Sequence, residues 1–119
     1  MNVSSGMGQL AGMNGGHAAY RLSKTALNAL TRSIAVDYAD RGIRCNTISP
    51  GYVVNERRDA DLTDERRARY EGMHLTRLGT GDDVAHAAVY LASRESELLT
   101  GANLPLDGGS GIARALALG

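Results

Sequence analysis

The chain has 119 residues, which suits one domain or part of one. Its 13 basic and 13 acidic side chains cancel, so net charge does not favour binding to nucleic acid or to an anionic membrane. Cys45 is the only cysteine, which excludes an internal disulfide and a cysteine-based metal site. Apolar runs are far shorter than a membrane span, and the start resembles no signal region. We expect a soluble, cytoplasmic protein.

The chain opens on Asn2-Val3-Ser4-Ser5, which is typical of the end of a strand, and a glycine-rich loop follows over residues 6–16. From His17 to Asp40 there is no Gly or Pro, and this stretch predicts a helix of about six turns. Arg41-Gly42 should end it, because glycine permits the left-handed conformation. The residues that recur at helical spacing are Leu22, Ala26, Ala29, Leu30, Ser33 and Ile34. This face must pack on something, and a second copy is the nearest candidate.

The second half of the chain continues the alternation of strands and helices. Ile43–Ile48 alternates apolar with polar or small residues and predicts a short strand that Ser49-Pro50-Gly51 ends. Thr63 offers a cap for a short helix within a charged stretch. A further helix should begin at Gly81-Asp82-Asp83 and run to about Ser93, before a last strand over Ala102–Leu106. Such an order implies a parallel sheet covered by helices.

Tyr20 and Lys24 carry the first chemical signal, because they lie four residues apart near the start of the long helix. This spacing stacks both side chains on one face, with about 5 to 6 Å between their Cβ atoms. An ammonium this close stabilises the ionised phenol, so the tyrosine can exchange a proton with a substrate oxygen near neutral pH. Tyr-x-x-x-Lys alone is a common chance match. The serine hydroxyls of Ser4-Ser5 add a third group for the same substrate oxygen.

Motifs along nearly the whole chain resemble the short-chain dehydrogenase/reductase family, and most broadly its bacterial 3-oxoacyl-carrier-protein reductase members. The motifs are Asn2-Val3-Ser4-Ser5, Ala19-Tyr20-Arg21-Leu22-Ser23-Lys24, Gly42-Ile43-Arg44-Cys45-Asn46, Ser49-Pro50-Gly51, Arg77-Leu78-Gly79, Asp83-Val84-Ala85, Tyr90-Leu91-Ala92-Ser93, Thr100-Gly101 and Leu106-Asp107-Gly108-Gly109. The resemblance implies an α/β fold. Residues 1–119 would be the carboxyl-terminal, active-site half of a doubly wound Rossmann-type parallel sheet.

The resemblance also implies an enzyme that transfers hydride between NAD or NADP and a ketone or secondary alcohol. Ser5 would orient and polarise the carbonyl, Tyr20 would exchange its proton, and Lys24 would bind the nicotinamide ribose. A homo-oligomer is expected too, since the long helix and the terminal strand commonly form subunit contacts in this family.

The resemblance further implies which residues line the nicotinamide pocket. These would be Pro50 and Gly51 with the backbone of Val53. Asn55 stands where many relatives have a threonine that binds the cofactor, and an amide can donate similarly.

Several alternatives stay open. Ser4 is an alternative to Ser5, because the loop from Ser5 to Tyr20 is longer than in many relatives, although Ser5 holds the last place of the serine motif. No glycine-rich strand-to-helix fingerprint precedes the site, so the half that holds most of the cofactor is expected to be absent. A non-catalytic truncated fragment and an oligomerisation module are the rival functions. The sequence does not choose between NAD and NADP.

Other features predict no site of their own. His17, His74 and His86 lack the spacing of metal ligands, so no metal is expected. Ser5-Gly6 is not a hydrolase elbow, because Val3 stands where that motif needs glycine. The charged run from Glu56 to Glu71 reads as a solvated helical face, in a region that often forms a mobile lid over the substrate in this family.

Overall fold

The computed structural model describes residues 1–5 and 17–113, so the loop expected over residues 6–16 lies outside the described residues. The helices and strands are β1 (Asn2–Val3), α2 (Ala18–Asp37), β2 (Thr47–Pro50), α3 (Asp64–Gly72), α4 (Gly81–Ala92) and β3 (Asn103–Leu106). Short 3-10 helices, η1 (Ala39–Arg41) and η2 (Arg94–Ser96), follow α2 and α4. This is the order expected from the sequence.

The strands form a single parallel sheet in the order β1-β2-β3. Val3 of β1 pairs with Ile48 of β2, and Pro50 of β2 pairs with Leu106 of β3. The predicted α/β class and parallel sheet are therefore confirmed. The opening strand is only 2 residues long, in keeping with the strand end expected there.

One face of the sheet is apolar and carries the hydrophobic core. Ile48 is fully buried there against Ala87 and Leu91 of α4, and Leu104 and Leu106 of β3 pack beside it. Burying an aliphatic side chain of this size contributes about 1.5 to 3 kcal/mol. This contact fixes α4 on the sheet.

The opposite face is polar, and α2 covers it. Asn2 Nδ2 donates to Thr31 Oγ1 of α2 at 3.0 Å, and the hydroxyls of Thr31 and Thr47 share a short hydrogen bond. Beside them, Ser49 Oγ donates to Asn103 Oδ1 at 2.7 Å. Thr31, Thr47 and Ser49 are at most 1% exposed. Because buried hydroxyls are costly unless paired, this network is what makes the polar face stable.

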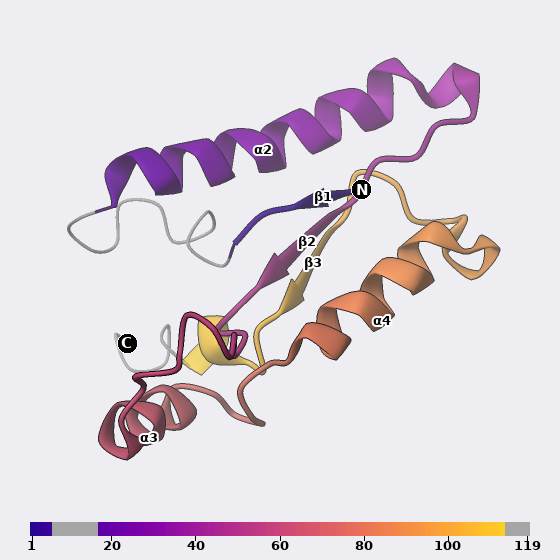
Figure 1. Ribbon diagram of the computed structural model, residues 1–119. Helices are drawn as coiled ribbons and strands as arrows, with labels where there is room; N and C mark the ends of the chain where they lie inside the picture. The colour runs from indigo at the N-terminus through magenta and orange to yellow at the C-terminus, as the bar shows by residue number, and fades with distance from the viewer. Residues whose placement is uncertain (6–16, 114–119) are drawn as a thin grey trace.

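The two crossover helices therefore lie on opposite faces of the sheet, since Thr47 and Ile48 are neighbours in one strand (Figure 1). The two crossovers, from β1 to β2 and from β2 to β3, step in the same direction across the sheet, but their helices α2 and α4 lie on opposite faces. One crossover is therefore right-handed and the other is left-handed. Crossovers of this type are right-handed in about 98% of cases, so one of the two has the uncommon hand. Both helices start from the same edge of the sheet.

The long helix ends earlier than predicted from His17–Asp40. It stops at Asp37 and tightens into η1, and Gly42 then adopts the expected left-handed conformation with φ 69°. The buried residues of α2 are Arg21, Thr31 and Ala35.

The α2 stripe, defined as Leu22, Ala26 and Leu30, faces solvent instead. Leu22 is 67% exposed and Leu30 is 51% exposed. The sheet therefore does not cover these three residues, whereas Ile34, which the same spacing picks out, is partly buried.

The prediction of a strand over Ile43–Ile48 is wrong in its bounds, because β2 begins at Thr47 and includes Ser49 and Pro50. The preceding residues are held by both side-chain and backbone hydrogen bonds. The Arg44 guanidinium donates at 3.0 to 3.4 Å to main-chain carbonyl oxygens around the end of α4, those of Leu91, Ser93, Ser96 and Leu99. This anchor adds to the backbone bonds of the stretch, in which Asn2 N–H donates to Asn46 O at 2.8 Å and Gly101 N–H donates to Cys45 O at 2.7 Å.

Pro50, the last residue of β2, ends the pairing with β1 because proline has no N–H to donate. Even-numbered residues of β2 bond to the first strand, as when Ser4 N–H donates to Ile48 O at 2.7 Å. The next bond of this ladder would run from the N–H of residue 50 to Ser4 O, and Pro50 has no N–H to make it, so the pairing with β1 goes no further.

Both shorter helices begin with a capping threonine. Thr63 Oγ1 accepts from Arg66 N–H, which confirms the predicted cap of α3. The helix α4 begins at Gly81, as predicted, and its cap is the preceding residue, Thr80. Its hydroxyl accepts from Asp83 N–H while the Asp83 carboxylate accepts from Thr80 N–H.

Candidate active site

The carboxyl ends of the parallel strands meet at one edge of the sheet, the carboxyl edge. Ser5 follows β1 there and Gly51 follows β2. The register of Val3 with Ile48, extended by two residues, brings Ser5 level with Pro50. Adjacent strands lie about 4.8 Å apart. Ligands of open α/β sheets bind at this edge, which makes it the candidate active site.

Tyr20 and Lys24 lie in the first two turns of α2, and Lys24 reaches the end of β1. Lys24 Nζ lies 5.6 Å from the centre of the Tyr20 ring and donates to the main-chain carbonyl oxygen of Val3 at 3.2 Å. Tyr20 is 45% exposed, so solvent reaches its ring. Lys24, the only lysine of the chain, thereby joins the helix pair to the end of β1.

The two serines at the end of β1 have different surroundings. Ser4 is 4% exposed, and its Oγ donates to the main-chain carbonyl oxygen of Lys24 at 3.2 Å. Ser5 is half-buried. The Ser4 hydroxyl is thus occupied in fastening β1 to α2, whereas Ser5 lies closer to solvent.

Gly51 packs tightly against the turn that follows β3. Its N–H donates to Leu106 O at 2.9 Å, and a Cβ at this position would lie 2.8 Å from Asp107 Cα. The Asp107 carboxylate in turn accepts from the N–H groups of Gly109 and Gly111 at 3.0 and 3.2 Å. The turn after the last strand therefore forms part of the wall behind Pro50 and Gly51.

The backbone around Val53 is fixed by a second segment of the chain. Val53 and Gly79 form an isolated parallel bridge, in which Val54 N–H donates to Gly79 O and Gly79 N–H donates to Tyr52 O, each at 2.9 Å. The bridge holds residues 52–54 against the segment that leads into α4.

Arg77 and Asp83 clamp that segment onto the start of α4. The Arg77 guanidinium makes paired hydrogen bonds of 2.7 Å with the Asp83 carboxylate. This guanidinium, together with Thr80 N–H, holds the pKa of Asp83 well below its usual range. The sequence motif contained both residues but gave no sign of their pairing.

Asn55 lies on an exposed turn beyond this bridge. Its Oδ1 accepts from the N–H groups of Arg57 and Arg58, both at 3.1 Å. Within residues 1–5 and 17–113, its Nδ2 makes no hydrogen bond. Asn55 Oδ1 thus stabilises the turn, and Asn55 Nδ2 is the group that can donate to a ligand.

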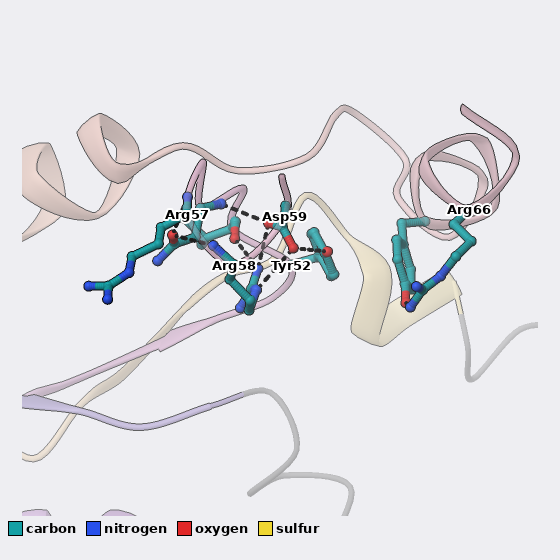
Figure 2. A network of polar contacts seen from close by, with 8 residues as sticks. Tyr52, Arg57, Arg58, Asp59 and Arg66 are labelled. Carbon is teal, nitrogen blue, oxygen red and sulfur yellow. Dashed lines mark hydrogen bonds and ion pairs between the residues drawn. The ribbon is translucent and has the colours of Figure 1, made fainter. Parts of the chain in front are cut away.

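A polar network that the sequence pattern did not predict organises residues 52–59 (Figure 2). The Asp59 carboxylate accepts from the Tyr52 hydroxyl and from Asn55 N–H, both at 2.8 Å. It also accepts from Arg58 Nε at 3.0 Å and from Arg58 Nη2 at 2.9 Å. The Arg58 guanidinium and then Asn55 N–H hold the pKa of Asp59 well below its usual range, while burial and the Asp59 carboxylate raise the pKa of Tyr52.

Tyr52 also connects this network to α3. Its ring stacks on that of Tyr70, with ring centroids 4.4 Å apart and an interplanar angle of 21°. Arg66 Nη2 donates to the Tyr70 hydroxyl at 3.3 Å, which raises the pKa of Arg66. The charged run thus includes a specific contact with the edge of the sheet in addition to a solvated helical face.

In the described part of the chain, no helix is long and apolar enough to cross a membrane. Nor do the described residues bring together three or more His, Cys, Asp or Glu side chains that could hold a metal ion.

The sequence model of a family described as enoyl-(acyl carrier protein) reductase matches residues 1–111. The chain belongs to the short-chain dehydrogenase/reductase family. A family member from Allochromatium vinosum, acetoacetyl-CoA reductase, is 38% identical over 109 residues, which cover 92% of this chain and 44% of that protein. The 3-oxoacyl-[acyl-carrier-protein] reductase of Rickettsia conorii is 36% identical over 109 residues with the same 92% and 44% coverage. This chain spans less than half the length of the short-chain dehydrogenase/reductases it matches.

Solved members of the short-chain dehydrogenase/reductase family have the same fold. A 4-hydroxyisoleucine dehydrogenase complexed with NADH matches with a TM-score of 0.78 and 30% identity, covering 92% of this chain and 44% of that one. A blue fluorescent protein from a metagenomic library, in complex with NADPH, matches with a TM-score of 0.79 and 31% identity, covering 92% and 43%. The expected Rossmann-type fold is confirmed, and the family is one of oxidoreductases that use nicotinamide cofactors.

Proposed function

We propose that this chain forms the active-site part of an NAD(P)-dependent oxidoreductase that interconverts a ketone and a secondary alcohol. The observation that supports the proposal is the contact of Lys24 with both the Tyr20 ring and the end of β1. It gathers a phenol, an ammonium and a strand end that bears serine at the edge where ligands bind in such sheets.

In this proposal Tyr20 is the general acid in reduction and the general base in oxidation, and its phenolic oxygen exchanges the proton with the substrate oxygen. The neighbouring Lys24 ammonium stabilises the phenolate that forms. Ser5 donates a hydrogen bond to the same substrate oxygen and orients the carbonyl. We favour Ser5 over Ser4 because Ser4 is only 4% exposed, whereas the half-buried Ser5 can be reached by a ligand.

The donors at the carboxyl edge fit a nicotinamide cofactor. An ammonium has three donors, and Val3 O accepts from Lys24, so further N–H groups remain for ribose hydroxyls. Pro50 and Gly51, with the Val53 backbone, form the nicotinamide wall in this proposal, and Asn55 Nδ2 donates to the carboxamide or phosphates. A bound nicotinamide supplies or accepts the hydride.

Residues 1–119 are then part of one catalytic domain, in which an amino-terminal half supplies the glycine-rich phosphate site. The test joins this chain to the amino-terminal half of an acetoacetyl-CoA reductase and measures NADH and NADPH fluorescence, with the chain alone as control. We expect enhancement and reduction of a ketone such as acetoacetyl-CoA in the joined protein only. A folded joined protein that binds neither nucleotide contradicts the proposal.

A buried Cys45 thiol suits the reducing cytoplasm, where we place this activity.

An oligomerisation module is the second candidate function, and the exposed α2 stripe favours it. Leu22 and Leu30 lie open on one helix face, and apolar patches of this kind mark interaction sites. We propose that the protein is a homo-oligomer in which a second copy covers this stripe. Sedimentation of the wild type and of Leu30→Glu tests this, with association expected only in the wild type. Association without any nucleotide binding by the joined protein would favour the module over the enzyme.

A further inference from the structure

We propose that Asp59 is a positioning residue for the cofactor loop, defined as residues 52–59. Through Tyr52 and Arg58 it fixes the loop so that the Val53 backbone and Asn55 meet the nicotinamide end of the cofactor. The inference rests on the proposed function and names a residue that determines how well this site holds its cofactor.

The Asp59 carboxylate binds the loop at its start, middle and end (Figure 2). Its oxygens accept hydrogen bonds from the Tyr52 hydroxyl, the Asn55 main-chain N–H and the Arg58 guanidinium. The backbone closes the same turn, because Asp59 N–H donates to Asn55 O at 2.7 Å. The Asp59 side chain is only 8% exposed, whereas that of Arg58 is 58% exposed. The carboxylate is therefore the buried centre of the loop, and its removal leaves several donors without an acceptor.

Asp59 reaches Val53 through Arg58. Arg58 Nη2, which donates to the Asp59 carboxylate, also donates to Val53 O at 2.8 Å. The same guanidinium lies 5.1 Å from the centre of the Tyr52 ring. On its other side, the Val53 backbone is held by the bridge to Gly79. Asp59 thus orients the guanidinium that fixes the proposed nicotinamide wall.

The network also couples the cofactor loop to α3. The Tyr52 hydroxyl donates to the Asp59 carboxylate, and the face of the Tyr52 ring stacks on Tyr70 of α3. In Figure 2, Arg57 points away from this cluster, so the two adjacent arginines have different roles. Loop and helix should consequently become ordered or disordered together when Asp59 is changed.

The test compares Asp59→Asn and Tyr52→Phe with Asp61→Asn in the joined protein. Asp61 is exposed, and loss of its charge is the matched control. Amide hydrogen exchange of residues 55–59, without nucleotide, reports the order of the loop. The KM for NADH or NADPH, kcat and the unfolding midpoint are measured alongside. For Asp59→Asn we expect exchange and the cofactor KM to rise about tenfold, with kcat within about twofold at saturating cofactor. Tyr52→Phe should raise the amide exchange rate and the cofactor KM by smaller factors. Asp61→Asn should change neither the exchange rate nor the KM.

The outcomes separate the two proposals. Unchanged exchange in Asp59→Asn overturns the loop role, and so does faster exchange with an unchanged cofactor KM. A lower unfolding midpoint with an unchanged KM also overturns it, since that result describes a merely structural residue. If the wild-type joined protein binds no nucleotide, the proposed function fails and this role fails with it, even where exchange shows that Asp59 orders the loop.

Discussion

Ser4 Oγ donates a hydrogen bond to the carbonyl oxygen of Lys24, so one serine at the end of β1 fastens the strand to the helix of the proposed catalytic pair. Ser4→Ala should therefore lower the free energy of unfolding by about 1 kcal/mol, the usual contribution of one such bond. Urea unfolding followed by circular dichroism measures this. Turnover of Ser4→Ala should fall much less than turnover of Ser5→Ala.

That neighbouring variant is Ser5→Ala, for which we expect the opposite pattern. Losing a hydrogen-bond donor to the reacting oxygen should lower kcat about 10²- to 10³-fold, while stability changes little. Both variants are assayed in the joined protein with saturating cofactor. A large loss of kcat in Ser4→Ala, with Ser5→Ala near wild type, would exchange the roles of the two serines.

Lys24 should respond directly to the cofactor. With lysine labelled with 15N at Nζ, the signal of Lys24, the only lysine of this chain, is identified in the joined protein by its loss in Lys24→Arg. Its ammonium is proposed to bind the nicotinamide ribose, so this signal should shift on addition of NADH or NADPH to the joined protein. A signal that stays unmoved at saturating nucleotide would exclude the ribose contact.

Local spacing in the sequence predicted the elements and residues whose geometry depends on near neighbours. Tyr20 and Lys24 share a helix face because they are four residues apart, and Thr63 caps α3 because its hydroxyl reaches the nearby Arg66 N–H. Gly42 is left-handed as expected, because only backbone freedom decides it.

Contacts that depend on distant segments were not predictable in this way. The bounds of β2 depend on its pairing with β3, from Thr47 to Pro50. The strand preference of Ile43 gave no sign that Arg44 anchors this stretch to residues 91–99. Asp59 was missed because its environment is set by the fold of its loop. The run Asn55-Glu56-Arg57-Arg58-Asp59 did hold a signal, since asparagine commonly bonds the backbone two residues on.

Gly51→Ala should destabilise the protein by about 1 to 3 kcal/mol, the usual cost of forcing an extra carbon into a packed site. The new Cβ would lie 2.8 Å from Asp107 Cα, so the turn after β3 must shift. Gly72→Ala, at the end of α3, is the control because no atom lies within 4 Å of its added Cβ. Thermal unfolding compares the two. Equal melting temperatures would mean that the two segments are not packed as described.

Stability should depend on pH through Asp83, whose pKa is lowered in the fold by Arg77 and by Thr80 N–H. A carboxyl with a lower pKa in the folded state stabilises the fold above its unfolded pKa of about 3.9, and this stabilisation is lost as the pH falls through the folded value. Asp83→Asn should therefore be less stable than the wild type at neutral pH. This gap, the difference between their free energies of unfolding, should narrow only in acid below about pH 4. Denaturant unfolding at several pH values measures the gap. A gap that stays constant into strong acid would contradict this role.

Tyr20→Phe in the joined protein tests the proposed chemistry most directly, because it removes only the oxygen that carries the proton. NADH and NADPH affinity, measured by fluorescence, should stay within about twofold of wild type, while turnover of a ketone substrate should fall about 10²- to 10⁴-fold, the usual contribution of general acid–base catalysis. Turnover in this variant at the wild-type rate would contradict the assignment of Tyr20 as the proton donor, and with it the proposed active site.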